Sequence, residues 1–127
     1  MPLGPAAVIA YLLAMSKALH HPGPEQIDLS AVLDALRDPI RRSIVLMVAE
    51  EGEKRCSSFL HCATKTNLTY HVARLREAGV VRVRAEGSAR VVSLRRAELE
   101  ARFPGLLDSV LNGARQDPPL ARLVEPA

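Results

Sequence analysis

The stretch from Thr64 to Leu94 limits the possible folds of this chain more than any other part of it. Its first half carries apolar residues at i, i+4, i+7 and i+10, the spacing of the buried side of a helix. These residues are Leu68, Val72, Leu75 and Ala78. Thr64 is a suitable N-cap and Gly79 a suitable C-terminal stop, so we predict a single helix between them.

A hairpin is predicted directly after this helix. Residues 80–85 and 89–94 alternate between apolar and polar side chains, and Glu86-Gly87-Ser88 can form the turn between them. The side chains expected to face the core are Val81, Val83, Ala85, Val92 and Leu94. A helix followed by a basic hairpin is the order of elements that places a helix in a DNA groove and steadies it with a β-wing.

Further helices are predicted on both sides of this stretch. They span residues 28–36, 39–51, 57–63, 97–102 and 104–112. Asp28 and Asp38 are suitable N-caps, and Pro39 suits a first helical position because its missing N–H would have no partner there. The residues expected to face inward are Leu29, Val32, Leu33, Leu36, Ile40, Ile44, Met47, Val48, Phe59 and Leu60.

The predicted fold class is mainly α with a two-stranded β-wing: a winged helix-turn-helix in the order α-α-α-α-β-β-α, with an extra N-terminal helix. We expect a DNA-binding and dimerisation domain over residues 28–113 and a flexible C-terminal tail over residues 114–127. Residues 1–27 are expected to form an extension, with a helix from Ala6 to Leu19 and a linker at residues 20–26. This extension is interpreted as either a dimerisation arm or an upstream extension of the coding frame.

Basic residues are concentrated around the predicted helix and hairpin. The chain has a net charge of +3, but residues 65–96 alone hold eight Lys or Arg against two acids, Glu77 and Glu86. Such a surface suits a polyanion. Arg41 and Arg42 lie near the start of the helix over residues 39–51, where the helix dipole does not favour cations. They are expected either to bind a phosphate or an acidic partner, or to be solvated.

The outward side of the predicted helix carries side chains that can read bases. Short polar groups near a helix N-terminus reach base edges in a major groove. The expected reading residues are Thr66, Asn67, Thr69 and Tyr70. The expected phosphate and wing contacts are Lys65, Arg74, Arg84 and Arg90. His71 lies beside the apolar positions and is expected at the edge of the core.

The run DPIRRSIVLMVAE, followed by CSSFLHCATKTNLTYHVARLREAGVVRVRAEGSARVVSLRR, is similar to winged helix-turn-helix repressors of the arsenic-repressor (ArsR/SmtB) family. The resemblance covers residues 29–112, and HVARLREAGVV with the basic hairpin after it is its most specific part. The segment LRRAELEARFPGLLDSVL resembles a subgroup that is common in actinobacteria. The resemblance implies a recognition helix at Thr64 to Ala78 and repression of a promoter by a homodimer that binds a palindromic operator.

The resemblance also implies that the first and last helices form the dimer interface. The residues expected there are Leu29, Val32, Leu106, Leu107, Val110 and Leu111. Metal-sensing members carry a Cys-x-Cys pair at positions that correspond to Glu53 and Arg55 here, and neither residue can supply a thiolate. Other members use Asp and His on the last helix, where this chain has Asp108 but no His. The usual metal sites are therefore expected to be absent, and no cofactor is expected.

The chain contains two cysteines, Cys56 and Cys62, whose spacing matches no standard zinc pattern. Three interpretations are open: a metal site that includes them, a thiol redox switch, or inert buried thiols. Such sparse cysteine usage favours a reducing cytoplasm. The apolar run from Ala6 to Met15 is too short to cross a bilayer, so no membrane association is expected.

The function expected from these residues is sequence-specific DNA binding in the control of transcription, with double-stranded DNA and a second copy of the chain as partners. The alternative is a winged-helix module that binds proteins and does not read DNA. No Ser/His/Asp set, phosphate-binding glycine loop or pair of carboxylates indicates an enzyme. Nothing in the sequence identifies an inducer.

Overall fold

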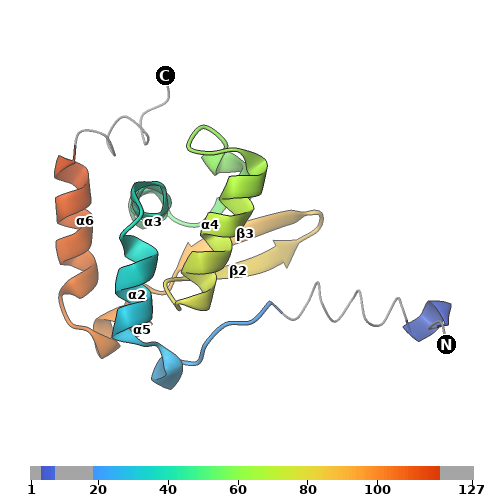
Figure 1. Ribbon diagram of the computed structural model, residues 1–127, viewed down its shortest axis with the longest axis horizontal. Helices are drawn as coiled ribbons and strands as arrows, with labels where there is room; N and C mark the ends of the chain where they lie inside the picture. The colour runs from blue at the N-terminus through green and yellow to red at the C-terminus, as the bar shows by residue number, and fades with distance from the viewer. Residues whose placement is uncertain (1–3, 8–18, 118–127) are drawn as a thin grey trace.

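The computed structural model describes residues 4–7 and 19–117 of the chain (Figure 1). The described part is mostly helical, with a small antiparallel sheet. Its helices are η1 (Pro24–Gln26), α2 (Leu29–Leu36), α3 (Pro39–Glu51), η2 (Cys56–Phe59), α4 (Lys65–Glu77), α5 (Arg96–Arg102) and α6 (Leu106–Gln116). Its strands are β1 (Lys54–Arg55), β2 (Val81–Glu86) and β3 (Ala89–Leu94). None of the described helices is long and apolar enough to span a bilayer.

The sheet has three strands where the sequence pattern predicted two. Their order is β1-β3-β2, so β3 lies in the middle, and Lys54 pairs with Val92 on its far side. The hairpin itself is confirmed, with Val83 opposite Val92 and a tight turn at Gly87-Ser88. Strand β1 escaped prediction because two residues are too few to show an alternating pattern.

The core lies between α3, α4 and the sheet, and most of the residues expected in it are buried there. Four residues expected to face inward are instead exposed: Leu29, Leu33, Leu60 and Ala85. Helix α2 has only eight residues and turns Val32, Ala35 and Leu36 to the core, so Leu29 and Leu33 form a neighbouring stripe that faces solvent. The third predicted helix is a single 3-10 turn in which Phe59 is buried, and the chain turns outward at Leu60.

The two aspartate caps are confirmed, and the last helix begins later than predicted. Asp28 accepts a hydrogen bond from the Ala31 backbone N–H, and Asp38 accepts from two N–H groups at the start of α3. Pro104 lies outside α6, because Gly105 stands between Pro104 and the first residue of the helix and has a φ of 81° in the left-handed region. Helix α6 continues to Gln116, so the expected flexible tail begins inside a helix; residues 118–127 lie outside the described part.

The segment Leu19–Ile27, here called the strap, is not the linker that was predicted. Ile27 is 1% exposed and belongs to the core. Three arginines hold the backbone of the strap by donating hydrogen bonds: Arg76 to His20 O, Arg95 to Pro22 O and Arg102 to Ile27 O, at 2.6–2.7 Å. The predicted helix from Ala6 to Leu19 falls largely on residues 8–18, which lie outside the described part.

The strap also seals the outer edge of β2. His21 Nε2 accepts a hydrogen bond from the Val83 backbone N–H at 3.0 Å, a donor that an open sheet edge would leave unpaired. Gly79 lets the strap approach, because a Cβ there would lie 2.7 Å from Ile27 Cγ1. Gly79 therefore has two uses: it ends α4 with a φ of 85°, and it makes room for the strap.

The His21 contact predicts a pH dependence of stability. Burial lowers the pKa of His21 from 6.5, and the nearby Arg82, Arg76 and Arg95 lower it further, against a hydrogen bond to Leu19 that raises it. The folded state thus favours neutral imidazole, so its contribution is complete above pH 6.5 and is lost as the pH falls towards the folded pKa.

We expect His21→Gln, which retains an acceptor but does not titrate, to lose less thermal stability than the wild type between about pH 7.5 and about pH 5. Circular dichroism melts measure this difference. His20→Gln is the matched control, since His20 belongs to the same strap but its side chain is exposed. An equal loss in all three proteins would show that His21 does not seal the strand edge.

Candidate nucleic-acid interface

Helix α4 is anchored by one side and presents the other to solvent. Its predicted N-cap is confirmed, because Thr64 Oγ1 accepts a hydrogen bond from the Asn67 backbone N–H at 3.2 Å. The predicted inward residues Leu68, Val72, Leu75 and Ala78 are all buried. His71 is 9% exposed and lies at the edge of the core, as expected.

The four expected reading residues lie on the exposed side of α4. Thr66, Asn67, Thr69 and Tyr70 are all exposed, and Tyr70 is 57% exposed although it is a large aromatic residue. Thr69 Oγ1 donates to the Lys65 carbonyl at 2.9 Å, which leaves its oxygen lone pairs as the outward-facing groups. The helix therefore offers amide, hydroxyl and phenol groups along a single turn and a half.

A buried arginine fixes the position of α4 relative to α2 and α3. Arg41 is 5% exposed and donates to the carbonyls of Ala35 at 2.6 Å and Asp34 at 3.2 Å, near the end of α2. Its Nη1 lies 3.2 Å from His71 Nδ1 on α4, and because a guanidinium only donates, Nδ1 is the acceptor. The expectations for Arg41, a contact with a phosphate or an acidic partner or else solvation, are therefore wrong.

Arg42 has a similar role and shows why these cations stand at the start of α3. Its Nη1 donates to the carbonyls of Leu36 at 2.9 Å and Arg37 at 2.7 Å. Arg41 and Arg42 thus both reach back to the C-terminus of α2, the end of a helix that a cation stabilises. The sequence suggested a misfit with the dipole of their own helix, but the dipole that they serve is that of the preceding helix.

Two of the expected DNA anchors are already paired with acids. Arg74 lies 2.7 Å from Asp34, and Arg84 lies 2.7 Å from Glu53 and 3.1 Å from Glu86. The hydrogen bond from Arg84 lowers the pKa of Glu53, so this carboxylate stays charged at neutral pH. Each pair would have to be broken or shared before its arginine could neutralise a phosphate, so both residues are weaker candidates for phosphate contacts than the sequence indicated.

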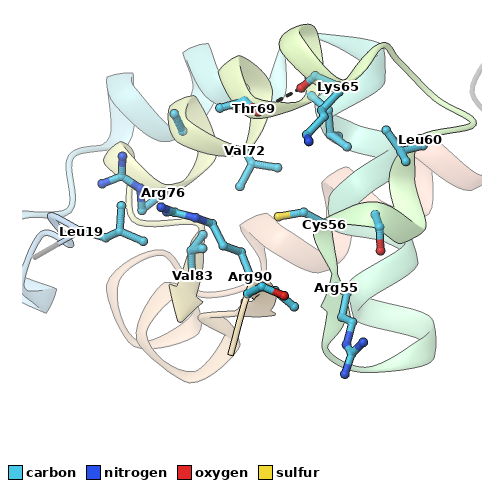
Figure 2. Close-up of a pocket in the computed structure, with 15 residues that line it drawn as sticks. Leu19, Arg55, Cys56, Leu60, Lys65, Thr69, Val72, Arg76, Val83 and Arg90 are labelled. Atoms are coloured by element: carbon cyan, nitrogen blue, oxygen red, sulfur yellow. Dashed lines mark hydrogen bonds between the residues drawn. The ribbon is translucent and has the colours of Figure 1, made fainter. Parts of the chain in front are cut away.

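Only three cations in the described part of the chain have neither an ion pair nor a side-chain hydrogen bond to a described residue. They are Arg55, Lys65 and Arg90. All three line one pocket of about 580 Å³ between α4, η2 and the hairpin. Figure 2 shows Lys65 and Arg90 extending towards the middle of this pocket, whereas the Arg55 guanidinium points away from it. Arg55 was not expected among the site residues, because the strand that places it was not predicted.

The two cysteines lie in or near this pocket. Cys56 is half-buried and lines it, whereas Cys62 is buried; the two cysteines do not form a disulfide. Burial raises the pKa of both thiols, and Arg90 only partly opposes this for Cys56. Over residues 4–7 and 19–117, no group of three or more His, Cys, Asp or Glu side chains could hold a metal ion.

The residues expected at a dimer interface divide into two groups. Val32, Leu107 and Leu111 are buried in the core of the single chain. They cannot contact a second chain directly and could only hold the exposed side chains above them in place. Leu29 is exposed, and Leu106 and Val110 are half-buried. Leu33, which was expected in the core, is 47% exposed and adds to this second group.

The chain matches no protein-family model and no curated protein sequence.

The buried Arg41 leads to a prediction about stability. We expect Arg41→Met to destabilise the protein by about 3 kcal/mol, because it leaves buried carbonyls and His71 Nδ1 without a donor. Chemical denaturation measures the loss. Arg37→Met is the control and should change stability by no more than about 0.5 kcal/mol, since the Arg37 side chain is 77% exposed. Equal stability of the Arg41 variant and the wild type would contradict the role of Arg41 in fixing α4 relative to α2 and α3.

Proposed function

We propose that this chain is a sequence-specific DNA-binding regulator of transcription with a winged helix-turn-helix fold. The observation that carries the proposal is the juxtaposition of the exposed polar face of α4 with the three unpaired cations beside it. Polar groups on a helix read base edges, and cations at its side hold the phosphates that position it. The similarity to repressors of the arsenic-repressor family points in the same direction.

In this proposal, η2 and α4 form the helix-turn-helix, and α4 enters the major groove. The hairpin of β2 and β3 acts as the wing; in Figure 1 it extends past α4 to one side. Thr66, Asn67, Thr69 and Tyr70 read bases. Lys65, Arg90 and Arg55 are the principal phosphate contacts, while Arg74 and Arg84 contribute less because of their acid partners.

The proposed regulator acts in the cytoplasm as a homodimeric repressor. Helices α2 and α6 both pack against α3, and the apolar residues that they leave at the surface are Leu29, Leu33, Leu106 and Val110. Apolar residues of this kind on two helices that pack against the same helix are suited to a twofold interface. A twofold dimer would present two copies of α4 to a palindromic operator.

The DNA contacts are tested by the salt dependence of binding. We expect Arg90→Gln to lower the slope of log affinity against log salt by about 1, because one phosphate contact is lost. Arg84→Gln is the matched control on the neighbouring strand and should change the slope much less, since Arg84 is neutralised internally. Fluorescence anisotropy on DNA from upstream of the gene measures both.

Two results of this experiment would contradict the proposal. Absence of saturable binding to that DNA at low salt would favour the alternative, a winged-helix module that binds proteins. A fall in slope for Arg84→Gln that equals the fall for Arg90→Gln would mean that the internal ion pairs do not decide which cations meet the phosphates.

The dimer is tested separately by sedimentation. We expect Leu33→Glu to sediment as a monomer, because a charge in an apolar interface would be desolvated without a partner. Leu60→Glu is the matched control. The exposed fraction of Leu60 is 50%, close to the 47% of Leu33, but Leu60 lies beside α4. A Leu33→Glu protein that remains dimeric would exclude this face of α2 from the interface.

A further inference from the structure

The pocket beside α4 has an apolar floor that DNA binding does not require. Its walls include Leu19 from the strap, Leu60, Leu68 and Val72 from the segment η2–α4, and Val83 from β2. In Figure 2 the side chains of Leu19, Val72 and Val83 converge on the same space as Cys56. A phosphodiester backbone is charged and hydrated, so it gains little from such walls.

The size and lining of the pocket suit a small organic molecule. Small-molecule sites have volumes of about 300–1,000 Å³, mostly apolar walls and a few placed polar groups. This pocket has a volume of about 580 Å³, and none of the residues that line it is Asp or Glu. Its charged groups are all cations, of which Lys65 and Arg90 reach inward without an internal partner. The complementary ligand is apolar over most of its length and carries one negative charge.

We propose that this pocket binds an organic carboxylate with an apolar body. The apolar part packs between Leu60, Val72 and Val83, and the carboxylate accepts hydrogen bonds from Lys65 and Arg90. The effect of the ligand on DNA binding rests on the proposed function. In that function Lys65 and Arg90 also contact DNA phosphates, so the ligand and DNA exclude each other. The ligand would then act as an inducer that releases the DNA.

The strap takes part in this site. Leu19 forms one wall of the pocket, and the adjoining His20 carbonyl accepts a hydrogen bond from Arg76, which lines the same pocket. The pocket therefore combines a residue of the strap, near the N-terminal end of the described domain, with residues of η2, α4 and the hairpin.

The site is tested without DNA, with decanoate as the probe. We expect one decanoate to bind each chain in calorimetry and to slow the alkylation of Cys56 by iodoacetamide, followed by mass spectrometry. Cys56 reports on this pocket because its thiol is part of the lining. Neutral 1-decanol, measured in the same way, should bind about tenfold more weakly or worse. Absence of saturable decanoate binding, or equal binding of decanol, would overturn the proposal.

Two variants at one exposed position separate charge from packing. We expect Leu60→Glu to bind decanoate at least about tenfold more weakly than Leu60→Gln, because only the former adds a carboxylate to the wall. Arg90→Gln should also weaken binding, whereas Arg84→Gln, outside the pocket, should not. Equal affinities in the two Leu60 variants would place the ligand elsewhere.

The coupling to DNA is a separate measurement. We expect saturating decanoate to weaken specific DNA binding by at least about tenfold. Decanoate that binds without changing DNA affinity would overturn the inducer role while leaving the site in place. If the chain bound no DNA, the proposed function would fail, but calorimetry and Cys56 protection would still decide whether the site exists.

Discussion

The buried guanidinium of Arg41 is the interaction on which the arrangement of the helices depends. It lies where α2, α3 and α4 meet, and it satisfies two carbonyls of α2 and the Nδ1 atom of His71 together. Apolar packing alone would allow small rotations between short helices, whereas a planar donor with fixed acceptors allows one arrangement. The direction in which α4 presents its polar face is thus set from the opposite side of the helix.

Internal contacts also determine how much positive charge the surface presents. Arginine is common in this chain, yet most of its guanidinium groups are used inside the domain, on helix ends, on the strap or on acids. Within the described part of the chain, the cations without such partners are Arg55, Lys65 and Arg90, and all three line the pocket beside α4. Counting basic residues in the sequence therefore overstates the positive charge that is available to a partner, because internal pairs neutralise much of it.

Local patterns in the sequence were sufficient for α4, the hairpin and the aspartate caps, because each depends on residues a few positions apart. The strap, β1 and the roles of Arg41, Arg74 and Arg84 were not predictable in this way. Most of their partners lie 30 to 75 residues away along the chain, and no periodicity connects them. For the candidate site, the exposed polar face of α4 followed from the helix pattern, but which cations lack an internal partner could be seen only in the fold.

The ion pairs of Arg74 with Asp34 and of Arg84 with Glu53 have a consequence for how this surface can evolve. Each acid masks a cation, Arg74 on α4 or Arg84 on β2. Replacing Asp34 by its amide would unmask Arg74 without altering the backbone, whereas Arg84 would keep Glu86 after the loss of Glu53. The surface therefore contains arginines whose charge is neutralised by neighbouring acids, and a single substitution of an acid can make the surface more strongly basic.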